Sequence, residues 1–390
     1  MKWEECLSPA VNDLAPSGIR KFFDIAAEME DIISLGVGEP DFVTPWSIRE
    51  SCVYGLEQGY TSYTSNRGLL ELRQEIALLH QRNFQVDYDP VEECLVTVGV
   101  SEGLDLAMRA VVGTGDEVLI PEPCYVSYKA CVTLAGGVPV PVAAKIENEF
   151  RITVAELEEH LTPKTKVLLI GYPNNPTGAV MSRQDLLEIA DFAEKHDLIV
   201  ISDEIYGDLT YGGVPHTCFS SLPRMKDRTI LLNGFSKAYA MTGWRIGYAL
   251  ANPVVIAAMT KIHQYTMLCA PITAQIAAVE ALRHGEKYMK KMVAEYDRRR
   301  HLIYDGFCSI GLECFEPKGA FYIFPSIKEL GLSSEEFAES LLYSERVALV
   351  PGNAFGECGE GFVRCSYATS VANITEALVR IENFVKKRKK

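Results

Sequence analysis

The stretch NGFSKAYAMTGWRIGY, residues 233–248, joins two short apolar runs through a polar turn. The first run, TILLNGF at 229–235, ends at Ser236 and Lys237, and the second begins at Arg245. A lysine at the end of a buried strand is poorly solvated, so its amine loses its proton more easily, as a Schiff-base nucleophile must. Arg245 follows closely enough to turn back toward the same place and bind an anion such as phosphate. Most single lysines at strand ends point into water, so this interpretation depends on the rest of the chain.

The composition is typical of a globular protein that binds neither nucleic acid nor membrane. The chain has 390 residues, of which 48% are hydrophobic and 23% charged, enough for two domains. Its net charge of −14 repels nucleic acid and anionic lipid. No stretch is long enough to span a membrane, and the N-terminus lacks the apolar core of a signal peptide. We therefore expect a cytoplasmic protein.

Cysteine and histidine spacing indicates neither a disulfide framework nor a metal site. The eleven cysteines form no CxxC pair, and several, such as Cys94 and Cys131, lie in apolar surroundings. The seven histidines show no spacing that is typical of metal ligands. We expect free thiols in a reducing compartment and no metal.

From about residue 48 to 285, short apolar runs alternate with stretches of helical periodicity. Near-continuous apolar strands separated by helices predict an α/β fold with a mostly parallel sheet covered on both faces. The connection between the last two runs is too short for a helix crossover, so one of these strands is expected to be antiparallel. The predicted strands are 94–99, 117–123, 138–142, 166–173, 198–206, 229–235 and 245–251, and the predicted helices include 101–112, 125–135 and 182–196.

After Leu282 strands and helices no longer alternate strictly, which predicts a smaller α+β domain. Its expected elements are a long charged helix at 285–308, strands at 319–325 and 362–367, and helices near 333–343 and 371–386.

At the other end of the chain, residues 1–16 are expected to form an arm, followed by a helix from Ile19 to Met29 and a strand and turn at 33–45. The prediction is therefore of three parts. Residues 1–47 form the arm and part of a small domain, 48–285 the large domain, and 286–390 the rest of the small domain.

Polar residues follow several of the predicted strands, where ligands bind in open parallel sheets. Val100 and Ser101 begin a helix directly after a strand, which favours an anion site made of backbone N–H groups. Asn175 follows another strand within a Pro-Thr-Gly turn, a position that also suits a simple turn. Asp203 ends a very apolar strand, with Tyr206 three residues later. A buried carboxylate needs a cationic partner, or it takes up a proton.

A phosphate site, a buried carboxylate, a phenol, an amide and a buried lysine together describe a pocket for pyridoxal 5'-phosphate. The sequence resembles the class I/II pyridoxal-phosphate-dependent aminotransferases of fold type I, in the branch of bacterial alanine, aromatic and acyl-diaminopimelate enzymes. The similar segments run in the family order over nearly the whole chain. They are GVGEPDF (36–42), YTSNRGLLELR (63–73), NPTG (175–178), SDEIY (202–206), SKAYAMTGWRIGY (236–248) and FVRCSYA (362–368).

This resemblance implies a role for each residue that holds the cofactor ring. Lys237 is expected to be the Schiff-base lysine, and Asp203 to face the pyridine nitrogen and keep it protonated. Tyr206 and Asn175 are expected to form hydrogen bonds to the ring oxygen, and Tyr125 to stack on the ring.

The resemblance also implies two anion sites. Arg364 is expected to bind the substrate α-carboxylate, aided by the backbone of Gly38. The groups expected to hold the phosphate are the Val100 and Ser101 amides, Ser236 and Arg245.

Tyr63 matches a residue that reaches the phosphate of the neighbouring subunit, so the resemblance implies a homodimer with shared sites. Gly234 departs from the family pattern, because many relatives carry a second phosphate-binding serine there. Phosphate binding is then expected to depend more on Ser236 and Arg245.

Several alternatives remain at this point. A pyridoxal-phosphate lyase that cleaves a C–S bond would share almost every residue named. A DNA-binding regulator with this domain would need an attached module, and the chain begins with only a short arm. A nicotinamide dehydrogenase would need a glycine fingerprint, which the sequence around Gly36 and Gly38 lacks.

The expected substrate class depends on two positions at which a charged side chain would bind a second carboxylate. Some aspartate-preferring relatives read the side-chain carboxylate with an arginine or lysine, and the matching positions here are Tyr265 and Ser101. Arg20 is a candidate substitute, but a surface role suits it equally well. We therefore expect a neutral or aromatic L-amino acid as donor and a 2-oxo acid such as 2-oxoglutarate as acceptor, with an aspartate-preferring enzyme as the alternative.

Overall fold

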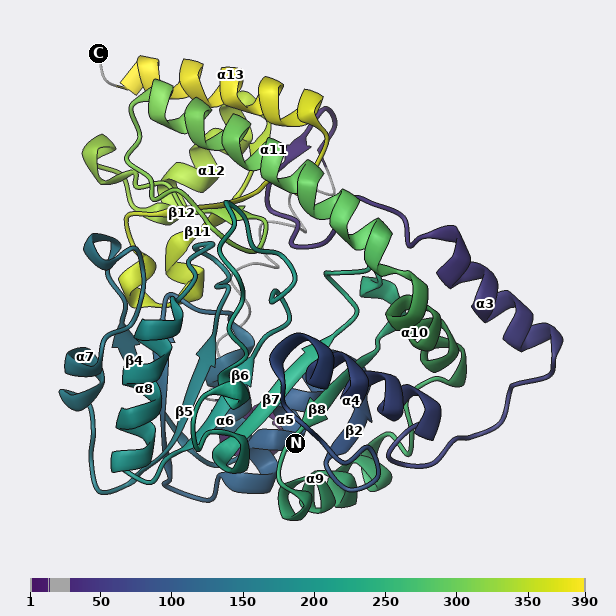
Figure 1. The fold of residues 1–390 in the computed structure, drawn as a ribbon. Coiled ribbons are helices and arrows are strands. Elements are labelled where there is room, and N and C mark those ends of the chain that lie inside the picture. The colour runs from purple at the N-terminus through teal and green to yellow at the C-terminus, as the bar shows by residue number, and fades with distance from the viewer. Residues whose placement is uncertain (1, 13, 15–28, 389–390) are drawn as a thin grey trace.

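A seven-stranded sheet lies at the centre of a computed structural model that describes residues 2–12, 14 and 29–388 (Figure 1). The strand order is β2-β8-β7-β6-β5-β3-β4, and neighbours are parallel except that β8 is antiparallel to both β2 and β7. Each predicted strand of this region is present, and the predicted antiparallel strand is confirmed. The bounds are β2 Cys94–Thr97, β3 Glu117–Glu122, β4 Val138–Ala143, β5 Thr165–Gly171, β6 Ile199–Asp203, β7 Thr229–Gly234 and β8 Gly247–Leu250.

The central strands are mainly apolar because both faces of the sheet are buried there. Along β3, Val118 packs into one apolar cluster and Leu119 into another, and Leu169 and Leu168 of β5 divide in the same way. Successive side chains of a strand point to opposite faces, so a continuous apolar run covers both. One face is covered by α5 (Gly99–Val111), α6 (Ser127–Leu134) and α9 (Pro253–Thr266), and the other by α4 (Leu70–Phe84), α7 (Val154–Glu158), α8 (Arg183–Lys195) and α10 (Ile272–His284).

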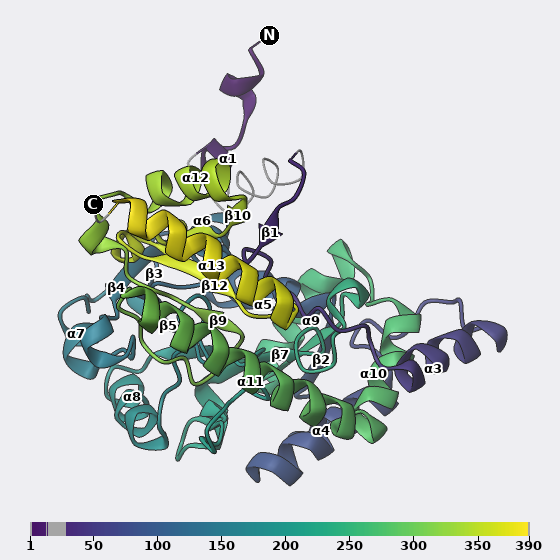
Figure 2. The ribbon, with the colours of Figure 1, turned by 90° about the horizontal axis from the view of Figure 1, so that it is seen from above.

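The C-terminal part packs three helices against two small sheets above the large sheet (Figures 1 and 2). The helices are α11 (Glu286–Ile310), α12 (Ser334–Glu345) and α13 (Val371–Arg388). An antiparallel sheet has the order β11-β12-β9, with β9 Tyr322–Ile323, β11 Val350–Pro351 and β12 Val363–Ser366.

Two predicted strands begin at least two residues later than the sequence suggested, and the backbone gives the reason. The strand predicted at 319–325 begins only at Tyr322 because Ala320 has a φ of 55°. The strand predicted at 245–251 begins only at Gly247 because Arg245 has a φ of 52°. A residue in the left-handed region cannot continue an extended strand.

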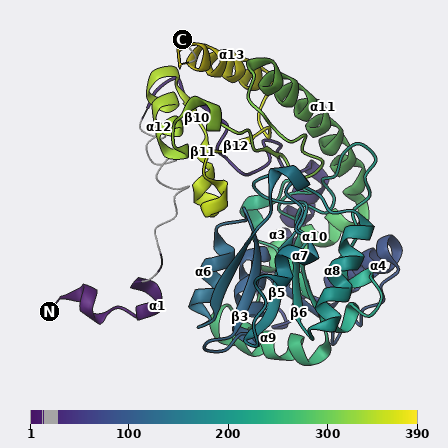
Figure 3. The same cartoon turned by 90° about the vertical axis from the view of Figure 1, so that its left-hand side faces the viewer.

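The N-terminal part of the chain joins the C-terminal part rather than the large sheet. β1 (Ile33–Ser34) pairs in parallel with β10 (Val347–Ala348). The division of the chain at residues 47 and 285 stays a prediction. The described part of the predicted arm holds a short helix, α1 (Pro9–Asn12), which lies outside the body beside α6 (Figure 3). Most of the helix predicted from Ile19 to Met29, with Arg20, lies outside the described residues.

Residues 36–44 link α11 to the loop that follows β7. Arg299 on α11 lies 2.9 Å from both carboxylate oxygens of Asp41, and its guanidinium packs on the Phe42 ring. Thr44 donates a hydrogen bond to the Ala240 carbonyl at 2.6 Å. The contacts hold residues 36–44 between the long C-terminal helix and the loop that carries Lys237.

We predict that Arg299→Met lowers the free energy of unfolding by about 2 kcal/mol, because it removes charge-assisted hydrogen bonds from a buried guanidinium. Methionine retains helix propensity, so the loss reports the contacts. Arg298→Met on the same helix is the matched control. The Arg298 side chain is 63% exposed, so its loss should cost less than about 0.5 kcal/mol. Urea denaturation measures both, and equal effects would contradict the prediction.

Candidate active site

A cavity of about 680 Å³ opens at the carboxyl ends of the central strands. All the predicted site residues except Tyr63 line it: Gly38, Val100, Ser101, Tyr125, Asn175, Asp203, Tyr206, Ser236, Lys237, Arg245 and Arg364. Tyr63 is 83% exposed and lies outside this cavity. The sheet topology therefore gathers residues that are far apart in the sequence at one edge, as expected for a parallel sheet.

Lys237 follows the end of β7 and points across the cavity toward residues 36–44. Its Nζ donates a hydrogen bond to the Gly38 carbonyl at 2.7 Å. Burial lowers the pKa of the Lys237 amine to about 8, while the nearby carboxylate of Glu39 opposes this shift. Its ammonium has no carboxylate within ion-pair distance among the residues that the structure describes. A desolvated amine of this kind is suited to nucleophilic and base chemistry.

The N-terminus of α5 and the Arg245 guanidinium form a cradle for an anion. Gly99 has a φ of 79°, and a Cβ added there would lie 2.9 Å from Arg245 Nη2, so only glycine lets the two groups approach. Arg245 Nη1 donates to the Thr242 carbonyl at 3.1 Å and forms no ion pair in the described part of the chain. A helix N-terminus and an unpaired guanidinium both attract phosphate. The residues at this end of the cavity therefore fit the phosphate of the expected cofactor.

The backbone excludes a side chain at Gly234, the position that departs from the family pattern. A Cβ there would lie 2.9 Å from the Cα of Gly247 and 3.3 Å from a methyl group of Val100. The close approach lets the β7–β8 hairpin pack on the first turn of α5. Ser236, which lines the same end of the cavity, remains as the serine available to an anion there.

Asp203 ends β6 as a buried carboxylate, and no cation of the described residues lies within ion-pair distance of it. Its Oδ2 accepts a hydrogen bond from the Tyr128 hydroxyl at 2.9 Å, and its Oδ1 accepts one from the Ile205 N–H at 3.2 Å. Burial raises the pKa of Asp203 to about 6, although the hydrogen bond from Tyr128 opposes the shift. No described residue makes an ion pair with it. A protonated ring nitrogen would supply the missing positive partner, so this end of the cavity fits a pyridine ring.

Arg364, on β12, is a buried cation that likewise makes no ion pair with any described residue. It is 3% exposed, its Nη1 donates to Asn175 Oδ1 at 3.0 Å, and its Nη2 donates to the Gly36 carbonyl at 2.6 Å. Its Nε is buried without a hydrogen-bond partner among the described residues. A buried guanidinium with a free N–H group is a binding site for a carboxylate.

Of the cavity-lining residues that were not singled out from the sequence, three carry ionisable side chains. Tyr128 lies three residues after Tyr125, and their rings meet edge to face at 5.8 Å. Helical spacing could have indicated that both face the cavity. Glu39, next to Gly38, accepts a hydrogen bond from Thr242 at 2.9 Å. The third, Tyr322, lies in the predicted strand at 319–325, and nothing in that run marks it out.

The described part of the chain shows no group of histidine, cysteine and acidic residues arranged to hold a metal. It contains no helix that is long and apolar enough to cross a membrane. The cysteines are all free thiols.

Comparison with known proteins gives consistent results over almost the whole chain. The family model for class I and II aminotransferases matches residues 30–381. YugH of Bacillus subtilis, provisionally named an aminotransferase, is 55% identical over 98% of both chains. An aspartate aminotransferase of Pyrococcus abyssi is 48% identical over 98% of this chain and 99% of its own. The crystal structure of an aromatic aminotransferase from Pyrococcus horikoshii is 46% identical and superimposes with a TM-score of 0.91, covering 95% of this chain and 99% of the other.

The raised pKa of Asp203 predicts how the cofactor-free protein responds to pH. The folded chain holds the Asp203 proton up to about pH 6, whereas an ordinary aspartate loses it near 3.8. Between about pH 3.8 and 6 the unfolded chain has lost this proton and the folded chain still holds it. The free energy of unfolding of the wild type therefore falls as pH rises. Asp203→Asn removes the ionisable group. The difference between the free energy of unfolding of this variant and that of the wild type should therefore rise by about 2–3 kcal/mol between pH 4 and 7. Denaturant titrations across this range measure it, and a constant difference would contradict it.

Proposed function

The chain belongs to the class I and II aminotransferases, which use pyridoxal 5'-phosphate, and from this premise we propose its reaction. It transfers an amino group from a neutral or aromatic L-amino acid to a 2-oxo acid such as 2-oxoglutarate. The match to the family model and the similarity to known aminotransferases confirm the resemblance inferred from the sequence, including fold type I and the cofactor. The observation that carries the proposal is a set of three charges around one cavity, the buried Asp203 and Arg364 and the half-buried Lys237, each without an ion-pair partner among the described residues.

The cofactor would lie between the β6 end and the N-terminus of α5. Asp203 would hold the proton of the ring nitrogen, and Tyr125 would stack on the ring. Tyr206 and Asn175 would form hydrogen bonds to the ring oxygen. The phosphate would be held by Val100 and Ser101 N–H groups, Ser236 and Arg245, which surround the cradle described above.

Lys237 is the residue that we propose binds the cofactor covalently and moves the proton. When bound, pyridoxal phosphate supplies an electron-withdrawing ring that stabilises negative charge at the substrate Cα. Once the substrate amine has displaced it from the cofactor, the Lys237 amine would take the proton from the substrate Cα and deliver it to the cofactor carbon. In the second half of the cycle it would move a proton in the opposite direction, onto Cα of the acceptor. A pKa of about 8 leaves a usable fraction of this amine deprotonated near neutral pH. Asp203, ionised above about pH 6, keeps the ring nitrogen protonated.

Arg364 would orient both substrates by their α-carboxylates. Its unpartnered Nε and the neighbouring Nη groups offer N–H donors to the planar carboxylate. The Gly38 backbone lies at the same end of the cavity, where its carbonyl accepts the Lys237 hydrogen bond. Donor and acceptor would thus occupy one position in turn, with Cα near Lys237.

Charge also supports the proposed substrate class. Among the described residues that line the cavity, the cations are Lys237, Arg245 and Arg364, and each already has a proposed role. Ser101 lines the cavity without a charge, and Tyr265 is 86% exposed and does not line it. A side-chain carboxylate would therefore find no cation among these residues. The relatives are named for both aspartate and aromatic amino acids, so an aspartate-preferring enzyme is the alternative.

A donor panel tests this function. With 2-oxoglutarate as acceptor, alanine or an aromatic amino acid should give the matching 2-oxo acid and glutamate in equal amounts, quantified by chromatography. Lys237→Ala is the control and should reduce turnover by several orders of magnitude, because it removes the group that moves the proton. Release of ammonia or a thiol without glutamate would identify a C–S lyase. Fast transfer from aspartate alone would contradict the substrate class.

We also propose that the enzyme is a cytoplasmic homodimer with shared sites. Free cysteines support a reducing compartment. Helix α3 (Trp46–Glu57) projects from the body in Figure 1 and exposes Trp46, Tyr54 and Leu56 by 50–60%. Large apolar side chains exposed along one helix favour protein contacts. Tyr63 follows this helix, is highly exposed, and would then reach the phosphate site of the partner.

Complementation tests the shared site. Lys237→Ala and Tyr63→Ala chains, when co-expressed, should form mixed dimers in which one site has both defects and the other has neither. About a quarter of the wild-type activity per chain is then expected, because half of the dimers are mixed and each has one intact site. Sedimentation must show a dimer. Activity equal to the sum of the two separate variants, or an active monomer, would contradict the proposal.

A further inference from the structure

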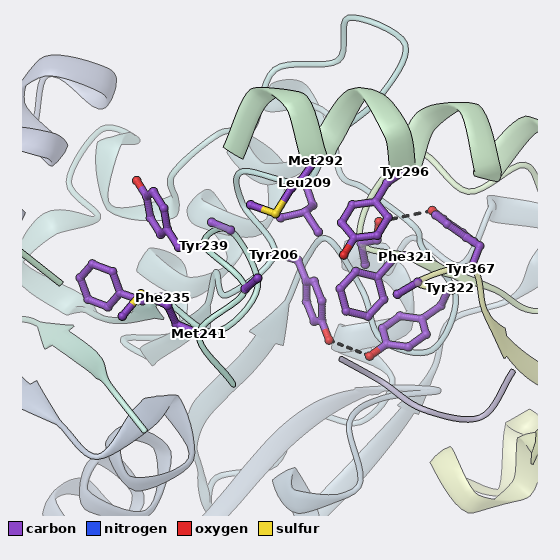
Figure 4. Packing of buried hydrophobic residues seen from close by; sticks show 14 of the residues in the cluster. Tyr206, Leu209, Phe235, Tyr239, Met241, Met292, Tyr296, Phe321, Tyr322 and Tyr367 are labelled. Carbon is purple, nitrogen blue, oxygen red and sulfur yellow. Dashed lines mark hydrogen bonds between the residues drawn. The ribbon is translucent and has the colours of Figure 1, made fainter. Parts of the chain in front are cut away.

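Tyr206 forms a hydrogen bond to a second buried phenol, Tyr322. Their hydroxyl oxygens are 2.8 Å apart, and the rings meet edge to face with centroids 5.8 Å apart (Figure 4). Both side chains are buried and both line the cavity. Within the described part of the chain, each hydroxyl has the other as its only hydrogen-bond partner. Two phenols thus share one contact at the edge of the cavity.

The number of hydroxyl protons in this pair limits how many hydrogen bonds the two tyrosines can donate. Each tyrosine hydroxyl carries one proton to donate and lone pairs to accept. If Tyr206 donates to Tyr322, it has no proton left for any other group. If Tyr322 donates to Tyr206, the single Tyr206 proton is free to point into the cavity.

The surroundings fix the Tyr322 hydroxyl in place. A Cβ at Gly38 would lie only 2.6 Å from Tyr322 Oη, so the loop is built around this oxygen. The Tyr322 ring lies against the guanidinium of Arg364, with 4.6 Å between Cζ and the ring centroid. Its backbone pairs with Ser366 in the sheet that carries Arg364. Tyr322 therefore has little freedom to turn away from Tyr206.

We propose that Tyr322 is a positioning residue whose hydroxyl donates to Tyr206 and so directs the Tyr206 proton to the ring oxygen of the cofactor. The inference rests on the role proposed above for Tyr206. Donation by Tyr322 polarises the Tyr206 O–H bond and strengthens the hydrogen bond that Tyr206 donates in turn. The ring of Tyr322 has a separate function, because its face packs against the carboxylate-binding guanidinium.

Tyr322→Phe separates the role of the hydroxyl from that of the ring, since it removes the hydroxyl and keeps the ring. The readout is the pH at which the visible absorption of bound pyridoxal phosphate changes. A hydrogen bond donated to the ring oxygen stabilises negative charge there, so its weakening should move this midpoint to higher pH. We expect a shift of about 0.5–1 unit for Tyr322→Phe and a larger one for Tyr206→Phe. Cofactor affinity, titrated on the cofactor-free protein, should fall about two- to fivefold for Tyr322→Phe.

Tyr367→Phe is the matched control. Tyr367 is a fully buried tyrosine of the same aromatic cluster, but its hydroxyl donates to the Ala320 carbonyl at 3.3 Å and it does not line the cavity (Figure 4). The midpoint should not move in this variant, even if its stability falls. A midpoint shift equal to that of Tyr322→Phe would overturn the proposal.

A double-mutant cycle distinguishes this inference from the proposal on which it rests. In the Tyr206→Phe background, Tyr322→Phe should cause no further midpoint shift, because the hydroxyl acts through Tyr206. A shift of unchanged size in that background would overturn the inference. If Tyr206→Phe alone leaves the midpoint unchanged, the role of Tyr206 itself is wrong. A shift to lower pH in Tyr322→Phe would show that Tyr206 donates to Tyr322, which also overturns the inference.

Discussion

Three charges at the cavity, each without an ion-pair partner in the part of the chain that the structure describes, constrain the rest of this structure. Burial raises the pKa of Asp203, and it lowers those of Lys237 and Arg364, so each charged form is disfavoured in the cofactor-free protein. A core that served stability alone would pair or omit such groups. A ring-nitrogen proton and a substrate carboxylate would supply the missing partners of Asp203 and Arg364. Binding then stabilises the folded state while it completes the site.

The architecture of the sheet determines where such charged side chains can lie. Helices cover both of its faces, so the carboxyl ends of the strands are where polar side chains can approach a ligand. The antiparallel strand β8 adds what a parallel strand could not. It returns the chain immediately after β7, which brings Arg245 beside the N-terminus of α5. Glycine at 234 and 247 lets the hairpin pack closely enough for this contact.

The strands, the fold class and several cavity residues could be predicted from the sequence because these depend on local patterns, whereas Tyr125, Gly38 and Arg364 were expected only from the family resemblance. Apolar runs marked the strands, and polar residues at their ends marked Asp203 and Lys237. Contacts made across long separations in the chain were beyond this reasoning. Tyr322 is near Tyr206 because residues 318–320 form backbone hydrogen bonds with residues 209–211, and no local pattern encodes that contact. Backbone turns such as the left-handed Ala320 likewise shortened a strand whose residues are all compatible with extended structure.

Residues 36–44 are held against the C-terminal part of the chain, and they help to complete a site that the large sheet forms only in part. The Gly38 carbonyl accepts a hydrogen bond from Lys237, and the Gly36 carbonyl accepts one from Arg364. The same segment is held by Arg299 of α11 and follows β1, which pairs with β10. The distance between Lys237 and Arg364 therefore depends on segments outside the sheet. If these residues have the roles proposed above, changes in the outer segments would alter which side chain fits beside the α-carboxylate and would leave Lys237 in place, so substrate preference would change separately from the chemistry.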